Sequence, residues 1–260
     1  MIQNPAYQQM VLDTFCTALE DASPAVRAKA AEALGKIGDV AIAPILVKTL
    51  KDTSPEVRRS AIQALGQLKD EASIPHLLAA GQDSDNFVRQ SVAEALGKIG
   101  DEKAIPGLLK LVEDSDSYVR RMAADALGKI GDDQAISGLL KLVEDSDSDV
   151  RKMAADALGK IGDEKAIPGL LKLVEHSDSH VRSSAADALG KIGDEKAIPG
   201  LLKLVEDPDA EIRQVSAIAL GKLGKEDIIP VLIRLLEDSN AQVRESAVDA
   251  LGSVAQYRVA

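Results

Sequence analysis

Apolar residues recur along the chain at the spacing of amphipathic helices. Between residues 105 and 112 they follow an i, i+3, i+4, i+7 pattern, which predicts one helix with a single apolar face. A polar run at 114–117 separates this segment from a second helical pattern at 119–130. Asp116 stands just before the second pattern, where an aspartate side chain can cap a helix N-terminus. The two segments together predict a helical hairpin.

This hairpin pattern returns every 31 residues. Eight copies fill residues 8–255 as the units 8–38, 39–69, 70–100, 101–131, 132–162, 163–193, 194–224 and 225–255, with tails at 1–7 and 256–260. A fixed period of this length is the signature of a stacked-repeat protein. We therefore predict an all-α fold, a single right-handed α-solenoid of eight stacked helical hairpins.

Each unit also keeps one arginine and one Leu-Gly pair at fixed positions. The arginines are Arg27, Arg58, Arg89, Arg120, Arg151, Arg182, Arg213 and Arg244. In the unit at 101–131 the pair supplies Gly128, and Gly131 follows it. Glycine is common where a helix stops, so we expect these two glycines to form the helix end and the turn into the next unit.

Composition narrows the classes of function. With 31 Lys and Arg against 42 Asp and Glu, the formal net charge is −11. Nucleic acid and anionic membranes attract concentrated basic side chains, so we expect neither as a partner. The single Cys16 excludes an intramolecular disulfide framework and fits a reducing compartment. The N-terminus lacks the pattern of a secretory signal, and no apolar run reaches the length of a membrane span, so we expect a cytoplasmic protein.

The repeated residues resemble the HEAT repeat in its short form, as found in the phycobilisome-lyase-like family and in the artificial alphaRep proteins derived from such sequences. The resemblance covers essentially the whole chain. Its marks are a proline in the first helix (Pro44, Pro75, Pro106, Pro168, Pro199, Pro230), an aspartate eight residues later (Asp52, Asp83, Asp114, Asp207, Asp238), and the arginine six residues beyond. Asp13 and Ser137 replace the proline, and His176 replaces the aspartate.

The resemblance implies a structural role for the arginine column. In HEAT-like arrays the turn aspartate, represented here by Asp114 and Asp145, forms a ladder with this arginine between adjacent units. Because every unit supplies the arginine, we interpret the column as holding the units together rather than as a ligand site.

Near-identical units differ mainly on one face of the second helix. The units at 101–131 and 163–193 differ only at Asp114/His176, Tyr118/His180, Arg121/Ser183 and Met122/Ser184. By resemblance, the second helices of a HEAT solenoid line its concave surface. Exposed positions can also vary without any function, which would explain the same differences. Against this, the equally exposed position of Lys110 is a lysine in each of the next three units.

This varied face is polar, but it includes residue types that are enriched at protein interfaces, namely two aromatics, Met and Arg. We predict a non-enzymatic scaffold that binds a protein partner there. The predicted partner-binding residues are Phe87, Tyr118, Arg121, Met122, Asp149, Lys152, Met153 and His180. A neighbouring acidic column is interpreted as a solvated face paired with nearby basic residues, or as a contribution to partner binding: Glu32, Glu94, Asp125, Asp156, Asp187 and Asp249.

No arrangement of residues predicts catalysis, so we predict no catalytic residue, no cofactor and no metal site. His176 and His180 have a metal-ligand spacing, but His176 should lie in the turn before the helix cap Asp178. Cys16 takes an apolar position of its unit and should pack in the first helix pair.

Two other functions remain open. One is a bilin lyase subunit or chromophore-handling factor, which an absorbance shift of a free bilin would reveal. The other is an engineered or consensus-type repeat binder. We expect a monomer, with end-to-end association as an alternative.

Overall fold

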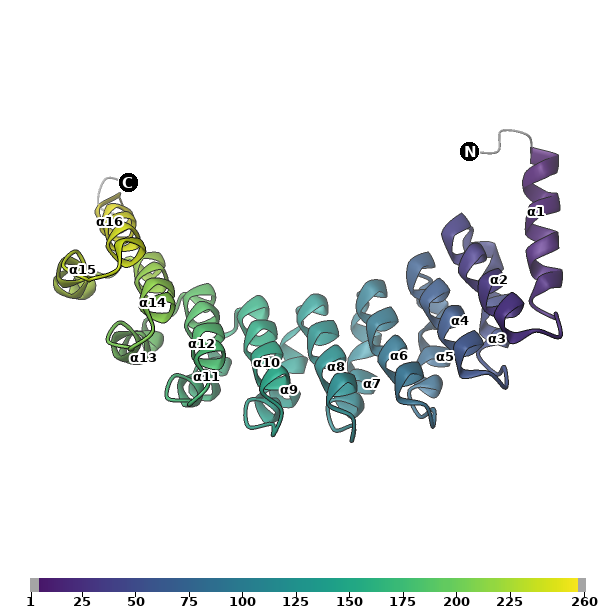
Figure 1. Cartoon of the computed structure of the whole chain (residues 1–260), viewed down its shortest axis with the longest axis horizontal. Helices are drawn as coiled ribbons and strands as arrows, with labels where there is room; N and C mark the ends of the chain where they lie inside the picture. The colour runs from purple at the N-terminus through teal and green to yellow at the C-terminus, as the bar shows by residue number, and fades with distance from the viewer. Residues whose placement is uncertain (1–4, 257–260) are drawn as a thin grey trace. The chain divides into compact units, whose positions relative to one another are not determined.

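The computed structural model describes residues 5–256 and is all-helical over that range. It contains sixteen α-helices, and its contacts divide the chain into two compact units, Met1–Ile130 and Gly131–Ala260. In the first hairpin both helices have 14 residues, and in every later hairpin a helix of seven residues precedes a longer one, so that the chain is a succession of helical hairpins (Figure 1). The predicted all-α solenoid of hairpins is confirmed.

The first unit holds eight of these helices. They are α1 (Pro5–Ala18), α2 (Pro24–Ile37), α3 (Ala43–Thr49), α4 (Pro55–Leu68), α5 (Ile74–Ala80), α6 (Asn86–Ile99), α7 (Ile105–Leu111) and α8 (Ser117–Ile130). Helix α2 packs against α4, α4 against α6, and α6 against α8, while each preceding helix packs on the long helix that follows it. Helix α1 begins at Pro5, inside the segment predicted as an N-terminal tail.

The second unit repeats the plan with the other eight helices. They are α9 (Ile136–Leu142), α10 (Ser148–Ile161), α11 (Ile167–Leu173), α12 (Ser179–Ile192), α13 (Ile198–Leu204), α14 (Ala210–Leu223), α15 (Ile229–Leu235) and α16 (Ala241–Gln256). Here α10, α12, α14 and α16 pack in sequence. We call the short helices from α3 onward, and α1, the A helices, and the even-numbered long helices the B helices.

A 3-10 turn of three residues leads into every A helix from α3 onward. In the turn Glu102–Ala104, the side chain of Asp101 accepts a hydrogen bond from the backbone N–H of Lys103 at 2.8 Å. The A helix then starts at Ile105, with Pro106 in its first turn, where the missing N–H leaves no bond unmade. From α3 onward the A helices are therefore short, because the 3-10 turn takes up the residues before them.

The core is aliphatic and contains many alanines. Val119, Ala123 and Leu127 on α8 are fully buried, as the helical spacing predicted. Alanine and glycine let the B helices approach closely. A Cβ added to Gly66 on α4 would lie 2.8 Å from the Cα of Ala95 on α6, a distance that side chains do not tolerate.

The two predicted glycine roles separate in the structure. Gly131 adopts a positive φ of 75°, in the left-handed region that favours glycine, so it does form the turn after a B helix. Gly128, in contrast, lies inside α8 and does not end it. The glycine of the Leu-Gly pair is a packing residue: its equivalents Gly66 and Gly97 sit against an alanine of the next B helix. Among the described residues, Lys69 is the single non-glycine residue with a positive φ, at 52°.

Candidate functional site

In five of the hairpins the conserved arginine reaches the turn aspartate of the next hairpin. Arg27 Nε donates to Asp52 Oδ2 at 2.7 Å and its terminal nitrogen donates to Asp52 Oδ1 at 2.8 Å. The same two-bond contact joins Arg58 to Asp83, Arg89 to Asp114, Arg182 to Asp207 and Arg213 to Asp238. These side chains are at most 15% exposed. We call each such pair a rung.

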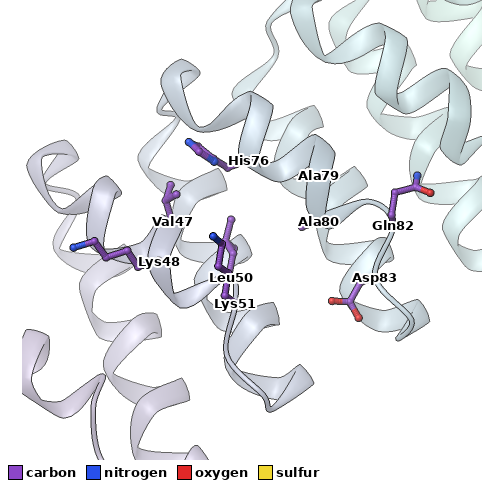
Figure 2. A pocket seen from close by; sticks show the side chains of 9 residues that line it. All are labelled: Val47, Lys48, Leu50, Lys51, His76, Ala79, Ala80, Gln82 and Asp83. Atoms are coloured by element: carbon purple, nitrogen blue, oxygen red, sulfur yellow. The ribbon is translucent and has the colours of Figure 1, made fainter.

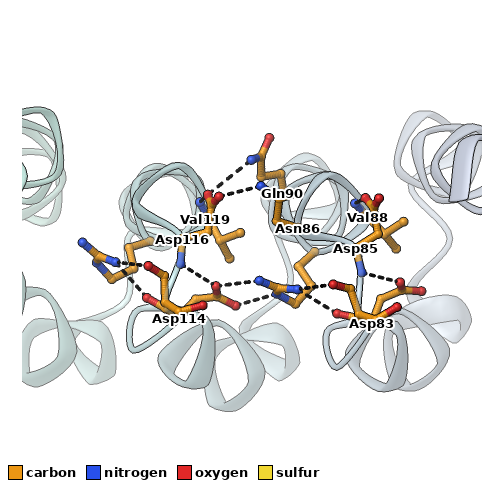
Figure 3. Close-up of polar contacts among 12 residues, drawn as sticks. Asp83, Asp85, Asn86, Val88, Gln90, Asp114, Asp116 and Val119 are labelled. Atoms are coloured by element: carbon orange, nitrogen blue, oxygen red, sulfur yellow. Dashed lines mark hydrogen bonds and ion pairs between the residues drawn. The ribbon is translucent and has the colours of Figure 1, made fainter.

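Each rung also fixes the turn that carries it (Figure 3). Besides its partner carboxylate, Arg89 donates to the backbone carbonyl of Asp83 at 2.8 Å. The Asp114 carboxylate in turn accepts from the backbone N–H of Asp116 at 2.9 Å. Asp116 caps α8 by accepting from the N–H of Val119 at 3.0 Å. Charge-assisted contacts with two hydrogen bonds fix the relative orientation of the two side chains and also add stability. The rungs therefore set the register between neighbouring hairpins.

The rungs also shift the pKa values of their aspartate carboxyl groups. The hydrogen bonds from Arg27 lower the pKa of the Asp52 carboxyl, with burial acting against them. Likewise, the bonds from Arg213 lower the pKa of Asp238. Both carboxylates are therefore held in the charged form that their arginines require.

One rung of the second unit is incomplete. His176 occupies the place of the turn aspartate, 25 residues after Arg151. Its Nδ1 accepts the backbone N–H of Asp178 at 3.0 Å, which imitates the aspartate's contact within the turn. With Nδ1 accepting, the ring proton of a neutral imidazole is on Nε2, so the ring offers no second acceptor. Among the described residues, the buried Nε of Arg151 has no hydrogen-bond partner.

The B-helix face of the first unit carries two exposed aromatic side chains. Phe87 on α6 is 52% exposed and Tyr118 on α8 is 57% exposed. They occupy equivalent positions on two helices that pack together. The guanidinium carbon of Arg59 lies 5.3 Å from the centroid of the Phe87 ring, and that of Arg121 lies 4.7 Å from the Tyr118 ring. Two stacked arginine–aromatic pairs thus stand on this face.

Arg59 was not among the residues predicted for this face. It occupies on α4 the position that Arg121 occupies on α8, so the column of equivalent positions already contained the signal. Met122, which was predicted, lies half-buried on α8. We call Arg59, Phe87, Tyr118, Arg121 and Met122 the aromatic patch.

The remaining predicted residues lie in the second unit. Asp149 and Lys152 on α10 form an ion pair of 2.6 Å, and Met153 beside them is half-buried. His180 on α12 is exposed. These side chains form a polar surface on the B helices of that unit, with a local ion pair where the first unit has an arginine–aromatic pair.

The acidic column of the B helices is largely paired within its own helices. Glu32 contacts Lys29 at 2.8 Å and Lys36 at 2.6 Å, and these two hydrogen bonds lower the pKa of Glu32 to about 2. Further pairs with a spacing of four residues join Glu94 to Lys98, Asp125 to Lys129 and Asp187 to Lys191. Asp156 differs, because burial raises its pKa.

Two adjacent grooves flank α5 on the A-helix side of the first unit. The larger, between α3 and α5, has a volume of about 450 Å³ and is lined by Val47, Lys48, Leu50, Lys51, His76, Ala79, Ala80, Gln82 and Asp83 (Figure 2). The second, between α5 and α7, has a volume of about 270 Å³. Neither groove was predicted. The signal was present in α5, where Ala79 and Ala80 replace the lysine and leucine that α7 has as Lys110 and Leu111.

The two histidines with a metal-ligand spacing and the single cysteine lie in separate places. His176 lies in a turn with Nδ1 already bonded, and His180 lies in α12. Cys16 lies half-buried in α1, and burial raises the pKa of its thiol. In residues 5–256, no group of three or more metal-ligating side chains comes together. None of the helices in this range combines the length and apolar character needed to cross a bilayer.

Comparison with known proteins agrees with the repeat architecture. The sequence pattern of HEAT repeats matches residues 12–97, 82–149, 136–218 and 198–260. The chain belongs to the HEAT-repeat family. No curated protein sequence matches the chain significantly.

Several solved structures share the fold. The crystal structure of an engineered protein is 27% identical, with a TM-score of 0.62 over 94% of this chain and 78% of that one. The Escherichia coli protein YibA is 20% identical, with a TM-score of 0.65 over 97% and 98%. The complex of CpcE and CpcF of phycocyanin lyase from Nostoc sp. PCC7120 is 23% identical, with a TM-score of 0.53 over 98% and 99%. The chain therefore shares its fold with the phycocyanin lyase complex and YibA, and it is similar to the engineered protein.

Proposed function

We propose that the chain is a non-enzymatic scaffold that binds a protein partner through the aromatic patch on α4, α6 and α8. The observation that carries the proposal is the exposure of Phe87 and Tyr118 together with the arginine stacked on each. The chain has only two Phe and three Tyr, so two of its five aromatics stand at equivalent exposed positions of adjacent B helices.

The arrangement suits recognition of a protein surface. Tryptophan, tyrosine and arginine are the residue types most enriched among those that dominate binding energy. An arginine stacked on a ring is restrained before binding, so less conformational entropy is lost when a partner covers it. Met122, half-buried beside Tyr118, offers a flexible apolar side chain that adapts to an irregular surface.

The predicted residues of the second unit offer mainly polar contacts. Asp149, Lys152 and His180 supply charge and hydrogen bonding on α10 and α12, and Met153 adds an apolar contact. Charged groups on a binding surface contribute more to specificity and association rate than to affinity. We assign these residues, as a surface of the second unit by itself, to partner selection.

The experiment is a quantitative affinity purification from the source cells with three matched baits. These are the wild-type chain, the Phe87→Ala, Tyr118→Ala variant, and the control Tyr7→Ala, Met10→Ala variant, whose residues on α1 are 59% and 61% exposed. The proposal predicts a partner that is recovered with the wild type and the control but lost with the patch variant. Equal recovery by all three baits would contradict it.

A further inference from the structure

The groove between α3 and α5 exists where a recurrent ion pair is missing. In the second unit, a basic residue of each later A helix contacts a glutamate at the end of the preceding one. Lys172 contacts Glu144 at 2.5 Å, Lys203 contacts Glu175 at 2.5 Å, and Arg234 contacts Glu206 at 2.8 Å. These bridges cross the A-helix surface from one hairpin to the next.

At α3 and α5 both members of the bridge have changed. Lys51 holds the position of the glutamate, and Ala79 holds that of the lysine. The next residue, Ala80, stands where α11 has the buried Leu173. Both the lysine that forms the ion pair and the large leucine side chain are therefore absent between α3 and α5. A cavity of about 450 Å³ is present there. That volume lies within the range of about 300 to 1,000 Å³ typical of ligand sites.

The groove has apolar walls and a basic rim. Val47, Leu50 and Ala80 are half-buried in it, and Lys48 and Lys51 are exposed at its edge (Figure 2). Neither ammonium group has an ion-pair partner among the described residues. Asp83, the one acidic lining residue, is already bonded to Arg58. Glu20 lines a neighbouring cavity with Lys48 but makes no ion pair with it in the described part of the chain.

A basic site is unusual on a chain whose formal net charge is −11. Two unpaired lysines beside apolar walls are complementary to carboxylates flanking an apolar side chain. We propose that this groove binds an acidic peptide segment of a protein partner, with one large apolar side chain seated between α3 and α5 and carboxylates on Lys48 and Lys51. Such a segment would use the groove as other peptides use apolar grooves between helices. This site is on the A-helix side and is separate from the aromatic patch, so it goes beyond the proposed function.

The test uses the whole chain and a labelled peptide of sequence Asp-Glu-Leu-Phe-Glu-Asp-Leu. Binding is measured by fluorescence polarisation, and its location by backbone amide chemical shifts. We expect saturable binding that weakens as salt rises, with shifts at α3 and α5. Two control peptides, one with lysines for the acids and one with serines for Leu and Phe, should not bind.

Protein variants make the test specific to the groove. The double substitution Lys51→Glu, Ala79→Lys installs the bridge that the second unit uses, so the fold should be retained while peptide binding falls by at least about tenfold. Lys51→Ala should weaken binding by about fivefold, the upper range for one surface ion pair. Lys222→Ala, which removes an exposed lysine on α14, should leave binding unchanged.

Three results would overturn the proposal. The first is no saturable binding of the acidic peptide, and the second is binding that the double variant does not reduce. The third is a concentration-dependent dimer, detected by sedimentation, that the same double variant abolishes, because this would assign the groove to a second copy of the chain.

Discussion

Arg151 and His176 are 25 residues apart, the spacing that joins arginine to aspartate in the rungs, yet the buried Nε of Arg151 is left without a hydrogen bond. In the following rung, Arg182 Nε donates to Asp207 at 2.7 Å. A buried donor left unsatisfied costs about 1–3 kcal/mol. The second unit therefore contains one weakened junction between hairpins.

Restoring the aspartate should strengthen this junction. His176→Asp supplies two acceptor oxygens to Arg151 and keeps an acceptor for the N–H of Asp178, so the free energy of unfolding should rise by about 1–3 kcal/mol. The measurement is urea denaturation followed by circular dichroism. The matched control is Asp207→His, which copies the defect into the next rung and should lower stability. An unchanged or reduced stability of the His176→Asp variant would refute this account of the rung.

Glycines of the Leu-Gly pair should respond to alanine according to what lies beside them. At Gly66 the new methyl would lie 2.8 Å from the Cα of Ala95, so Gly66→Ala should destabilise by about 1–3 kcal/mol. At Gly252 in α16 nothing lies within 4 Å of the added Cβ. There the higher helix propensity of alanine should stabilise by up to about 1 kcal/mol. Thermal unfolding of both variants checks the opposite signs, and two shifts of the same sign would contradict the packing role.

The rungs predict loss of stability in acid. The arginine bonds hold the pKa values of Asp52 and Asp238 below their ordinary range, so the stability they add is present above the unfolded pKa of about 3.9. It is lost as the pH falls through the lower folded pKa values. The free energy of unfolding, measured between neutral pH and about pH 3, should therefore decline in acid.

The Asp52→Asn, Asp238→Asn variant provides the control for this pH dependence. It lacks both titrating carboxylates, so it should be less stable than the wild type at neutral pH and lose less stability in acid. If the variant lost as much stability as the wild type over the same range, the rungs would not be the source of the acid sensitivity.

The hairpin repeat could be predicted because its residues interact with their own or the next unit at fixed spacing. Val119 and Leu127 were correctly expected in the core, since the apolar stripe of α8 follows the helix period. Glycine is common at helix ends, and on that ground Gly128 was expected to end its helix. It lies inside α8 instead, because a glycine is needed there for close packing between helices. The spacing of residues along one helix does not reveal such packing.

The surfaces were harder to predict for a similar reason. Variation between near-identical units singled out Tyr118 and Arg121, but not Arg59, whose unit is too divergent for that comparison. The groove beside α5 comes from Ala79, Ala80 and Lys51, each unremarkable alone. The groove forms only when α3 and α5 lie side by side, because the missing ion pair and the missing leucine side chain then fall at the same place.

The most direct test of a protein partner on the aromatic patch is a binding constant. Calorimetry with the purified partner should show that Tyr118→Ala, Met122→Ala weakens binding by at least about tenfold with unchanged helical content, because interface aromatics carry a large share of binding energy. The control Tyr7→Ala, Met10→Ala removes the same two residue types from exposed positions on α1 and should bind as tightly as the wild type. Equal affinity of the patch variant and the wild type would contradict the claim.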